Sequence, residues 1–450
     1  MSALLYTLVW FGALADQLAG WRLAGNAAGL CLLAFLLLEF PRQRRYAQLV
    51  FLALLGLGLL GVVRAADPLS LFLAAWRRGA VFAAFFFALG TLREAAETSP
   101  LVRRCGQQLV AQPAGRRYAA LTAGAHVFGI ILSYGTIDLL AAMVARADAQ
   151  NAVRLRRMML AIYRGFLLMN CWAPLNLMTV VVGTALPGAP MRLLLPFALL
   201  VSLVMLALGW LEDRLFGAAG GVEPPRAPAT DGWSIHLGIV GLVLLVMILA
   251  EATAQFGHVS LAAGVTLALP PIALGWIAVQ LRRFGTVRLP VLLLRRLKKF
   301  HARIPGFRGE ATILGASGFV GVALVGLLPA GGLAPLLAAL PPVLIPMLVP
   351  LVLIATGQLG LNPIAVITIL GSAMPAPESL GLPSAVLAFA CMLSWGLAVG
   401  MTPMSASAIA AARWSGVDPW TVSTRWNARF TLWGLLLSWA AIAAIFWTWN

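Results

Sequence analysis

The sequence predicts an all-α, polytopic membrane protein with roughly ten to twelve transmembrane helices. Of its 450 residues, 61% are apolar and only 10% are charged, and the mean hydropathy is +0.92. Soluble domains are usually about 45–50% apolar and about 25% charged. Apolar segments also recur from one end of the chain to the other, so we interpret the whole chain as one membrane domain. At about 20 residues per crossing, its length allows that number of helices.

Positive charge predominates among the few charged residues, with 32 Lys and Arg against 15 Asp and Glu and a formal net charge of +17. An excess of this size can indicate nucleic-acid binding. In so apolar a chain it is better explained by cytoplasmic loops, which are enriched in Lys and Arg. We therefore expect a multi-pass protein of a bacterial-type inner membrane, with the lipid bilayer as its partner and no nucleic acid.

The sequence lacks the motifs of several function classes. Its four cysteines are isolated from one another, which predicts neither a metal site nor a disulfide framework. We find no Ser/His/Asp set, no Walker motif and no His/Cys spacing for a metal. These absences argue against an ATP-driven pump and against a redox carrier, so we expect no enzyme activity and no cofactor.

The first half, residues 1–211, is built from apolar segments. They lie at 3–18, 24–40, 46–63, 68–91, 118–134, 136–146, 158–185 and 190–211. Arg77 and Arg78 interrupt the fourth segment and indicate an interfacial turn there. Residues 92–117 carry five arginines among spaced apolar residues, which is typical of an amphipathic arm that lies at the membrane surface.

Residues 212–232 form the only long polar stretch, rich in Pro and Gly, and we interpret them as a linker between two halves. The second half, residues 233–450, has its own series of apolar segments. They lie at 234–253, 257–281, 310–328, 332–355, 361–374, 383–412 and 430–448. Within this half, 282–308 contains nine Lys and Arg residues and predicts a second basic arm.

An internal repeat is indicated when residues 101–134 are laid on 293–326 without gaps. Eight positions are identical, among them the paired arginines at 103–104 and 295–296 and the prolines Pro113 and Pro305. Leu and Ala matches carry little weight in so apolar a chain, whereas the arginines and prolines carry more. The alignment predicts two structural repeats.

A polar, proline-centred break interrupts one apolar segment in each half. The breaks are Asn170-Cys171-Trp172-Ala173-Pro174-Leu175-Asn176 and Gly400-Met401-Thr402-Pro403-Met404-Ser405-Ala406-Ser407. Either proline alone would be explained by a simple kink, but two breaks at corresponding places predict discontinuous helices. Unwound backbone at membrane depth occurs only where it is buried in protein or lines a cavity. Its half-helix N-termini attract anions, and its free carbonyls can coordinate Na⁺.

A second polar interruption precedes each break. It is Ser133-Tyr134-Gly135-Thr136 in the first half and Gly357-Gln358-Leu359-Gly360-Leu361-Asn362-Pro363 in the second. The apolar runs that follow, 137–145 and 364–370, are too short to span a bilayer. Re-entrant hairpins are therefore predicted, the alternative being a kinked span with an interfacial loop.

This layout resembles the ion transporter superfamily, which includes the dicarboxylate/citrate and arsenite-type carriers. The resemblance lies in a hairpin tip with Asn or Ser/Thr followed by a broken span, once per half, from about residue 92 onward. Only Thr402-Pro403 matches a Thr-Pro break directly, and the Ser-Asn-Thr motif of the dicarboxylate branch is absent. The resemblance implies inverted repeats. Inversion would place the arms 92–117 and 282–308 on opposite membrane faces, whereas their shared basic character favours one face.

The predicted substrate site lies at mid-membrane, where tips and breaks meet. Half-helix N-termini would hold an anion there together with hydroxyl and amide groups. The residues assigned to the site are Ser133, Gly135, Thr136, Asn170, Pro174, Asn176, Asn362, Pro363, Thr402, Pro403, Ser405 and Ser407.

Ionisable residues at membrane depth are candidates for ion coupling. Asp138, just past the first tip, is the best candidate for coupling to H⁺ or Na⁺, the alternative being a partly solvated loop carboxylate. His126 could carry protons near neutral pH, or be a hydrogen-bonded packing residue. Arg164 could pair with an anionic substrate, or extend its guanidinium to the membrane surface.

These features predict a secondary active transporter that moves a small, carboxylate-like anion across the inner membrane, coupled to H⁺ or Na⁺. We expect no bound cofactor, except Na⁺ if it is the coupling ion. The oligomeric state is open, and a homodimer is one possibility. Two other classes stay open: a cation/proton antiporter of similar fold, and a membrane-embedded enzyme or assembly factor for lipid-linked precursors. The antiporter needs ionisable residues in the core, and the enzyme needs catalytic groups in large extramembrane loops.

Overall fold

A computed structural model describes residues 1–43, 45–113, 115–148, 151–216, 232–327 and 333–449. Within these ranges the chain is helical and contains no β-strand. Ten helices among the described residues are long and apolar enough to cross a membrane. The predicted all-α, polytopic membrane fold is therefore confirmed. Residues 217–231, most of the predicted linker, lie outside the described ranges.

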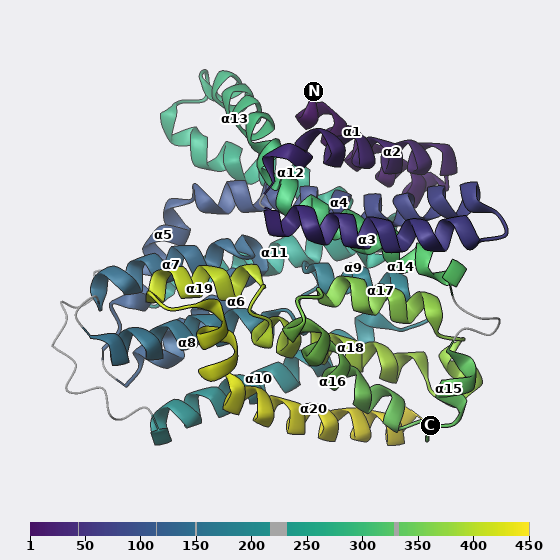
Figure 1. Ribbon diagram of the computed structural model, residues 1–450. Coiled ribbons are helices and arrows are strands. Elements are labelled where there is room, and N and C mark those ends of the chain that lie inside the picture. The colour runs from purple at the N-terminus through teal and green to yellow at the C-terminus, as the bar shows by residue number, and fades with distance from the viewer. Residues whose placement is uncertain (44, 114, 149–150, 217–231, 328–332, 450) are drawn as a thin grey trace.

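The chain begins with four long helices (Figure 1). They are α1 (Ser2–Ala19), α2 (Arg22–Glu39), α3 (Arg45–Arg64) and α4 (Pro68–Glu97). Asp67 caps α4 by accepting a hydrogen bond from the backbone N–H of Ser70. The turn predicted at Arg77 and Arg78 is wrong, because α4 is continuous. Arg77 lies 3.8 Å from Asp16, and Arg78 donates to the Thr184 carbonyl at 3.1 Å, so both charges have partners inside the protein.

The first arm is shorter than predicted. Residues 92–97 are the last turns of α4, and only α5 (Pro100–Val110) lies apart from it as an amphipathic helix. The second arm contains α13 (Leu289–Arg303), which follows α11 (Ser234–Phe256) and α12 (Leu261–Leu281). None of the residues of α13 is buried, and Figure 1 shows it projecting from the body of the molecule. Short 3₁₀ turns, 282–284 and 304–307, flank it.

Both halves contain a hairpin of two short helices and then a broken helix. In the first half these are α6 (Arg117–Leu132), α7 (Gly135–Ala147), α8 (Ala152–Met169) and α9 (Leu177–Ala185). In the second they are α16 (Leu344–Gln358), α17 (Pro363–Ala373), α18 (Ser384–Met401) and α19 (Ala406–Ser415). A long helix closes each series, α10 (Met191–Phe216) and α20 (Ala428–Trp449).

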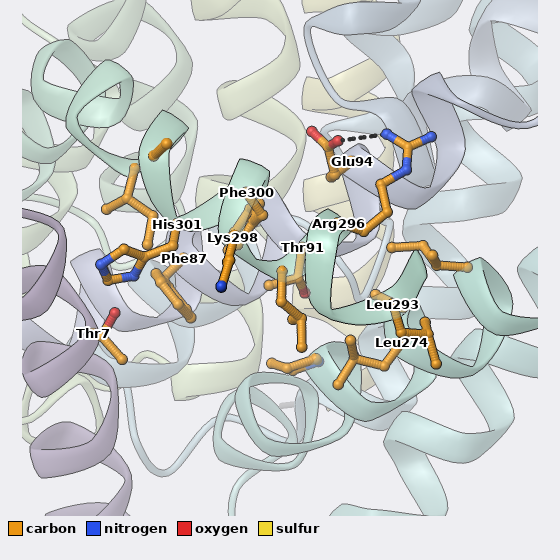
Figure 2. Close-up of a pocket in the computed structure, with 16 residues that line it drawn as sticks. Thr7, Phe87, Thr91, Glu94, Leu274, Leu293, Arg296, Lys298, Phe300 and His301 are labelled. Carbon is orange, nitrogen blue, oxygen red and sulfur yellow. Dashed lines mark hydrogen bonds and ion pairs between the residues drawn. The ribbon is translucent and has the colours of Figure 1, made fainter. Parts of the chain in front are cut away.

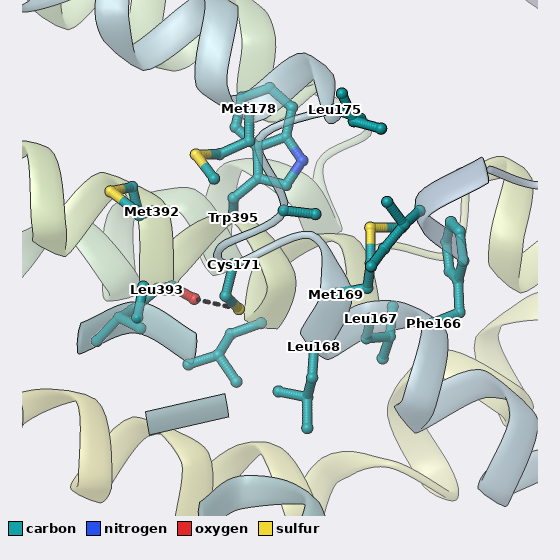
Figure 3. Packing of buried hydrophobic residues seen from close by; sticks show 14 of the residues in the cluster. Phe166, Leu167, Leu168, Met169, Cys171, Leu175, Met178, Met392, Leu393 and Trp395 are labelled. Carbon is teal, nitrogen blue, oxygen red and sulfur yellow. Dashed lines mark hydrogen bonds between the residues drawn. The ribbon is translucent and has the colours of Figure 1, made fainter. Parts of the chain in front are cut away.

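The two broken helices cross in opposite directions. The Tyr163 hydroxyl donates to the Gly400 carbonyl at 3.0 Å, and Cys171 Sγ contacts the Leu393 carbonyl at 3.6 Å (Figure 3). Between these contacts, a side chain at Gly396 would come within 2.8 Å of the Leu167 carbonyl, so the close approach requires glycine. As the residue number rises from 163 to 171 along the first broken helix, the contacted residue number falls from 400 to 393 along α18. The two helices are therefore antiparallel. Accordingly, α7 packs on α19 and α9 packs on α17.

The gap-free sequence alignment does not coincide with this packing. It places α6 on α14 (Arg308–Ala323), but α14 packs chiefly on α3, α4 and α17. The helix that packs as α6 does is α16: α6 lies against α8, and α16 lies against α18. The short helix α15 (Ala334–Ala338) precedes α16 and divides the apolar segment predicted at 332–355. The basic helix α13 instead connects α12 to α14.

Candidate functional site

Four helix N-termini meet at one cavity of about 160 Å³. The residues that precede these helices are Tyr134 for α7, Asn176 for α9, Asn362 for α17 and Ser405 for α19. All four line the cavity. Both hairpin tips and both helix breaks are therefore brought together at the same place, although the two tips, like the two breaks, are more than 200 residues apart in the chain.

The first break is held open by side-chain amides. Asn176 accepts a hydrogen bond from the Met178 N–H at 2.9 Å, which caps α9, and its own amide donates to Asn170 Oδ1 at 2.8 Å. The Asn170 amide donates back to the Phe166 carbonyl at the end of α8. Pro174 lies between the two asparagines. The side chains thus replace the backbone hydrogen bonds that the break removes.

The second break uses hydroxyl groups and a glutamine. Thr402 donates to the Ala398 carbonyl at 2.6 Å, and Ser405 caps α19 by accepting from the Ala408 N–H at 3.1 Å. Gln358, from the first helix of the second hairpin, donates to the Met401 carbonyl. This carbonyl belongs to the last residue of α18, so the hairpin supplies a partner at the point where the helix ends.

The structure brings together only some of the predicted substrate-site residues. Those that line the cavity are Ser133, Asn170, Asn176, Asn362, Pro363, Thr402 and Ser405. The others, Gly135, Thr136, Pro174, Pro403 and Ser407, do not line it. Ser407 is fully buried with its hydroxyl 3.1 Å from that of Ser405, and Thr136 is fully buried with no partner for its hydroxyl.

Asp138 lies outside the cavity. Its carboxylate pairs with Arg413 of α19 and accepts a hydrogen bond from Trp414 Nε1 at 3.1 Å. The side chain is 43% exposed. Asp138 therefore joins the first hairpin to the second broken helix and does not line the cavity.

His126 also lies outside the cavity, buried against α8 and the first break. Its Nδ1 is 3.0 Å from the Gly165 carbonyl, and its Nε2 accepts a hydrogen bond from Trp172 Nε1 at 2.8 Å. With a carbonyl on one side and an N–H on the other, this pattern fits the neutral ring protonated on Nδ1. A second proton on Nε2 would face the Trp172 donor, so the geometry is that of the packing alternative.

Arg164 is buried and has protein partners. It pairs with Glu212 at 3.3 Å, donates to the Tyr118 hydroxyl at 3.2 Å, and lies over the Phe430 ring. The guanidinium therefore does not line the cavity and is held among protein side chains.

Sequence reasoning missed the wall contributed by α14. Glu310, Ile313, Leu314 and Ser317 of this helix all line the cavity, at the spacing of one helical face. Glu310 is the only charged side chain among the lining residues, and the fully buried Ser317 has no partner for its hydroxyl in the part of the chain that the structure describes. A lone carboxylate at the start of an apolar segment was the available signal, but it adjoins the basic stretch 282–308 and was overlooked there.

A larger cavity, about 460 Å³, lies between α1, α4, α12 and α13 (Figure 2). Its walls are mostly apolar and include Phe87, Leu274 and Ile277. The acidic group that reaches it, Glu94, pairs with Arg296 at 3.3 Å and Arg303 at 2.7 Å. These ion pairs hold α13 to α4. Among the described residues, no three His, Cys, Asp or Glu side chains are grouped as a metal site would require.

No family model matches the sequence, and no curated protein matches it. A crystal structure of the Alcanivorax borkumensis YdaH transporter, described as having an unusual topology, is similar with a TM-score of 0.52. The match covers 94% of this chain and 98% of that one. The chain shares the fold of a solved transporter. At 14% sequence identity the likeness establishes the fold alone, so membership of the ion transporter superfamily stays a hypothesis.

Proposed function

We propose that this protein is a secondary active transporter that moves a small, carboxylate-like anion across the membrane, coupled to H⁺ or Na⁺. The observation that carries the proposal is the meeting of four helix N-termini at one cavity. Each N-terminus has about half a unit of positive charge and backbone N–H groups without intrahelical partners. An anion held among them gains fixed dipoles in place of water.

The side chains around the cavity fit a small polar solute. Asn176, Asn362, Thr402 and Ser405 supply amide and hydroxyl groups, while Trp395 and Leu175 supply apolar surface. A cavity of about 160 Å³ suits a solute with few carbon atoms. The dipoles select negative charge, and the apolar wall accepts the short carbon skeleton of a carboxylate.

Transport requires that the site open to each side in turn. We propose that the hairpins and broken helices move as one unit against a scaffold that includes α1–α4 and α11–α14. The antiparallel crossing of α8 and α18, with α7 on α19 and α9 on α17, supports an inverted repeat. In such an arrangement, one hairpin serves each membrane face.

Uptake of radiolabelled succinate and citrate into proteoliposomes, with and without imposed H⁺ and Na⁺ gradients, tests this proposal. We expect gradient-driven uptake that falls at least tenfold in Asn362→Ala and Thr402→Ala. Asn151→Ala is the matched control, because Asn151 also caps its helix, α8, by accepting a backbone N–H on its side-chain Oδ1, but it does so away from the cavity. Absence of uptake for every anion, or equal loss in Asn151→Ala and Asn362→Ala, would contradict the proposal.

A cation/proton antiporter is the second candidate, because Glu310 places one ionisable carboxylate in the cavity wall. It predicts that added Na⁺ collapses a preset pH gradient in proteoliposomes without any anion. The enzyme alternative is less well supported, because the residues that line the cavity include no His, Cys or Asp.

A further inference from the structure

We propose that Glu310 carries the coupling proton, an inference that rests on the proposed anion transport. In this mechanism a proton from the aqueous phase binds a Glu310 carboxylate oxygen, and the neutral acid then allows the anion to bind in the same cavity. The cavity then opens to the opposite aqueous phase, while Glu310, on the scaffold helix α14, stays in place. On the other side the anion leaves, the carboxyl group releases its proton to water, and the charged form of Glu310 is restored.

Glu310 differs from every other carboxylate that the structure describes. Each of the others has a hydrogen-bond or ion-pair partner in another residue. The pairs are with arginine for Asp16, Glu39, Glu94, Glu97, Asp138, Asp148, Glu212, Asp213 and Glu251, and with backbone N–H groups for Asp67, Glu378 and Asp418. Glu310 alone, among the described carboxylates, lacks such a partner. An unpaired carboxylate can change its protonation state without breaking a structural bond.

The surroundings of Glu310 contain few other charges. Arg93 of α4 acts on it through space, but Arg93 forms its own ion pair with Glu97 at 2.7 Å. Arg308, on the same helix, pairs with Glu39 of α2. The faces of α3 and α17 that line the cavity carry no charged side chain.

Two tyrosines complete the titratable groups near Glu310. They are Tyr6 of α1, whose hydroxyl donates to the Ala83 carbonyl at 3.1 Å, and Tyr134 at the first hairpin tip. Tyrosine stays neutral near pH 7. Glu310 is therefore the group in this wall that can exchange a proton between the two aqueous phases.

Electrostatic repulsion couples the protonation of Glu310 to the binding of the anion. The helix N-termini attract negative charge to the cavity, whereas a charged Glu310 in the same wall repels it. The anion therefore binds more tightly when Glu310 is neutral. By thermodynamic linkage, the anion raises the proton affinity of Glu310 by the same factor. The cavity thus favours two states, empty with Glu310 charged and occupied with Glu310 neutral.

Proteoliposomes containing wild type, Glu310→Gln and Asp138→Asn separate the two coupling candidates. Two activities are measured for radiolabelled succinate: accumulation driven by an inward proton gradient, and exchange against internal succinate without a gradient at pH 6 and pH 8. Glutamine keeps the shape of a neutral Glu310 and binds no proton. Asp138→Asn is the control, since Asp138 pairs with Arg413 outside the cavity.

We expect Glu310→Gln to retain exchange, with an apparent affinity that changes less than twofold between pH 6 and pH 8. Its proton-driven accumulation should fall at least tenfold. Wild-type exchange should weaken at least fivefold at pH 8, and Asp138→Asn should behave as wild type.

Proton-driven accumulation by Glu310→Gln, or accumulation driven by Na⁺ alone in wild type, would overturn the assignment and leave anion transport standing. Loss of both activities in a Glu310→Gln protein that unfolds at the wild-type temperature would make Glu310 a direct ligand instead. If wild type exchanges no anion at all, the transport proposal fails, and this assignment fails with it.

Discussion

Two glutamates, each lining a cavity, show how differently one residue type is used in this molecule. Glu94 reaches the larger, apolar cavity and has an arginine on each carboxylate oxygen. Glu310 lines the smaller cavity, which has more polar groups in its wall, and has no partner in another residue that the structure describes. The first holds helix α13 to α4, whereas the second is the group to which we assign the coupling proton. The two glutamates are distinguished by their ion-pair partners rather than by the size of the cavity that each lines.

The walls of the two cavities also differ in their polar groups. The larger one is built mostly from apolar side chains such as Phe87 and Leu274, which cannot form hydrogen bonds that would orient a polar solute. Helix N-termini, side-chain amides and the unpartnered hydroxyl of Ser317 converge on the smaller one. Polar groups in a protein interior are usually satisfied by the protein itself. A cavity whose wall holds a buried hydroxyl, Ser317, and a carboxylate, Glu310, neither with a partner in another described residue, is therefore the better candidate for a ligand.

The largest effect on stability is expected at Glu94. Glu94→Ala removes both ion pairs and should lower the free energy of unfolding by about 2–3 kcal/mol, less than the loss of a wholly buried pair because both arginines are partly exposed. Glu310→Ala removes no partner and should change it by less than about 0.5 kcal/mol. Denaturant unfolding in detergent compares the two variants. Equal destabilisation would break the distinction between the two glutamates.

A smaller effect on stability, with a clear effect on transport, is expected for Asn176→Ala. The variant loses the cap of α9 and the bond to Asn170, which should cost about 1 kcal/mol. Anion uptake should fall about tenfold because the break that lines the cavity loses its shape. Ser260→Ala removes a cap from α12 away from the cavity, so it should cost similar stability and leave uptake unchanged. Parallel loss of uptake in both variants would show that stability alone governs activity.

The smallest effect is expected from filling the larger cavity. Leu274→Phe adds volume at a partly exposed position in its wall and should change anion uptake by less than twofold. Leu314→Phe makes the same substitution in the wall of the smaller cavity, where Leu314 is buried, and should reduce uptake strongly. Initial uptake rates in proteoliposomes distinguish them. A strong loss in Leu274→Phe would mean that the larger cavity takes part in transport.

Features that depend on local sequence were predicted well. The breaks at Pro174 and Pro403 could be predicted because proline and small polar residues interrupt otherwise apolar segments. The hairpins could be predicted from the length of the apolar runs, and α7 and α17 are indeed too short to span a bilayer. In both cases a physical limit acts on a few neighbouring residues.

Features that depend on distant partners were not predicted. Asp138 drew attention as a charge near a hairpin tip, but Arg413, 275 residues away, neutralises it. His126 finds its partner in Trp172, and Arg78 finds one in the Thr184 carbonyl. Glu310 was missed for the opposite reason. Its significance lies in the partner that it lacks, and this is visible only when the neighbouring helices are in place.

The sequence by itself determined the membrane fold, the positions of the hairpin tips and the positions of the helix breaks. These follow from hydropathy, segment length and proline chemistry, which act within one segment at a time. Only the tertiary structure decided that the tips and breaks meet at one cavity, that the two broken helices cross antiparallel, and that Glu310 faces that cavity without a partner among the other described residues. The physical reason is that charge pairing and cavity walls are formed by residues from different helices. Their meeting is set by packing across the whole chain.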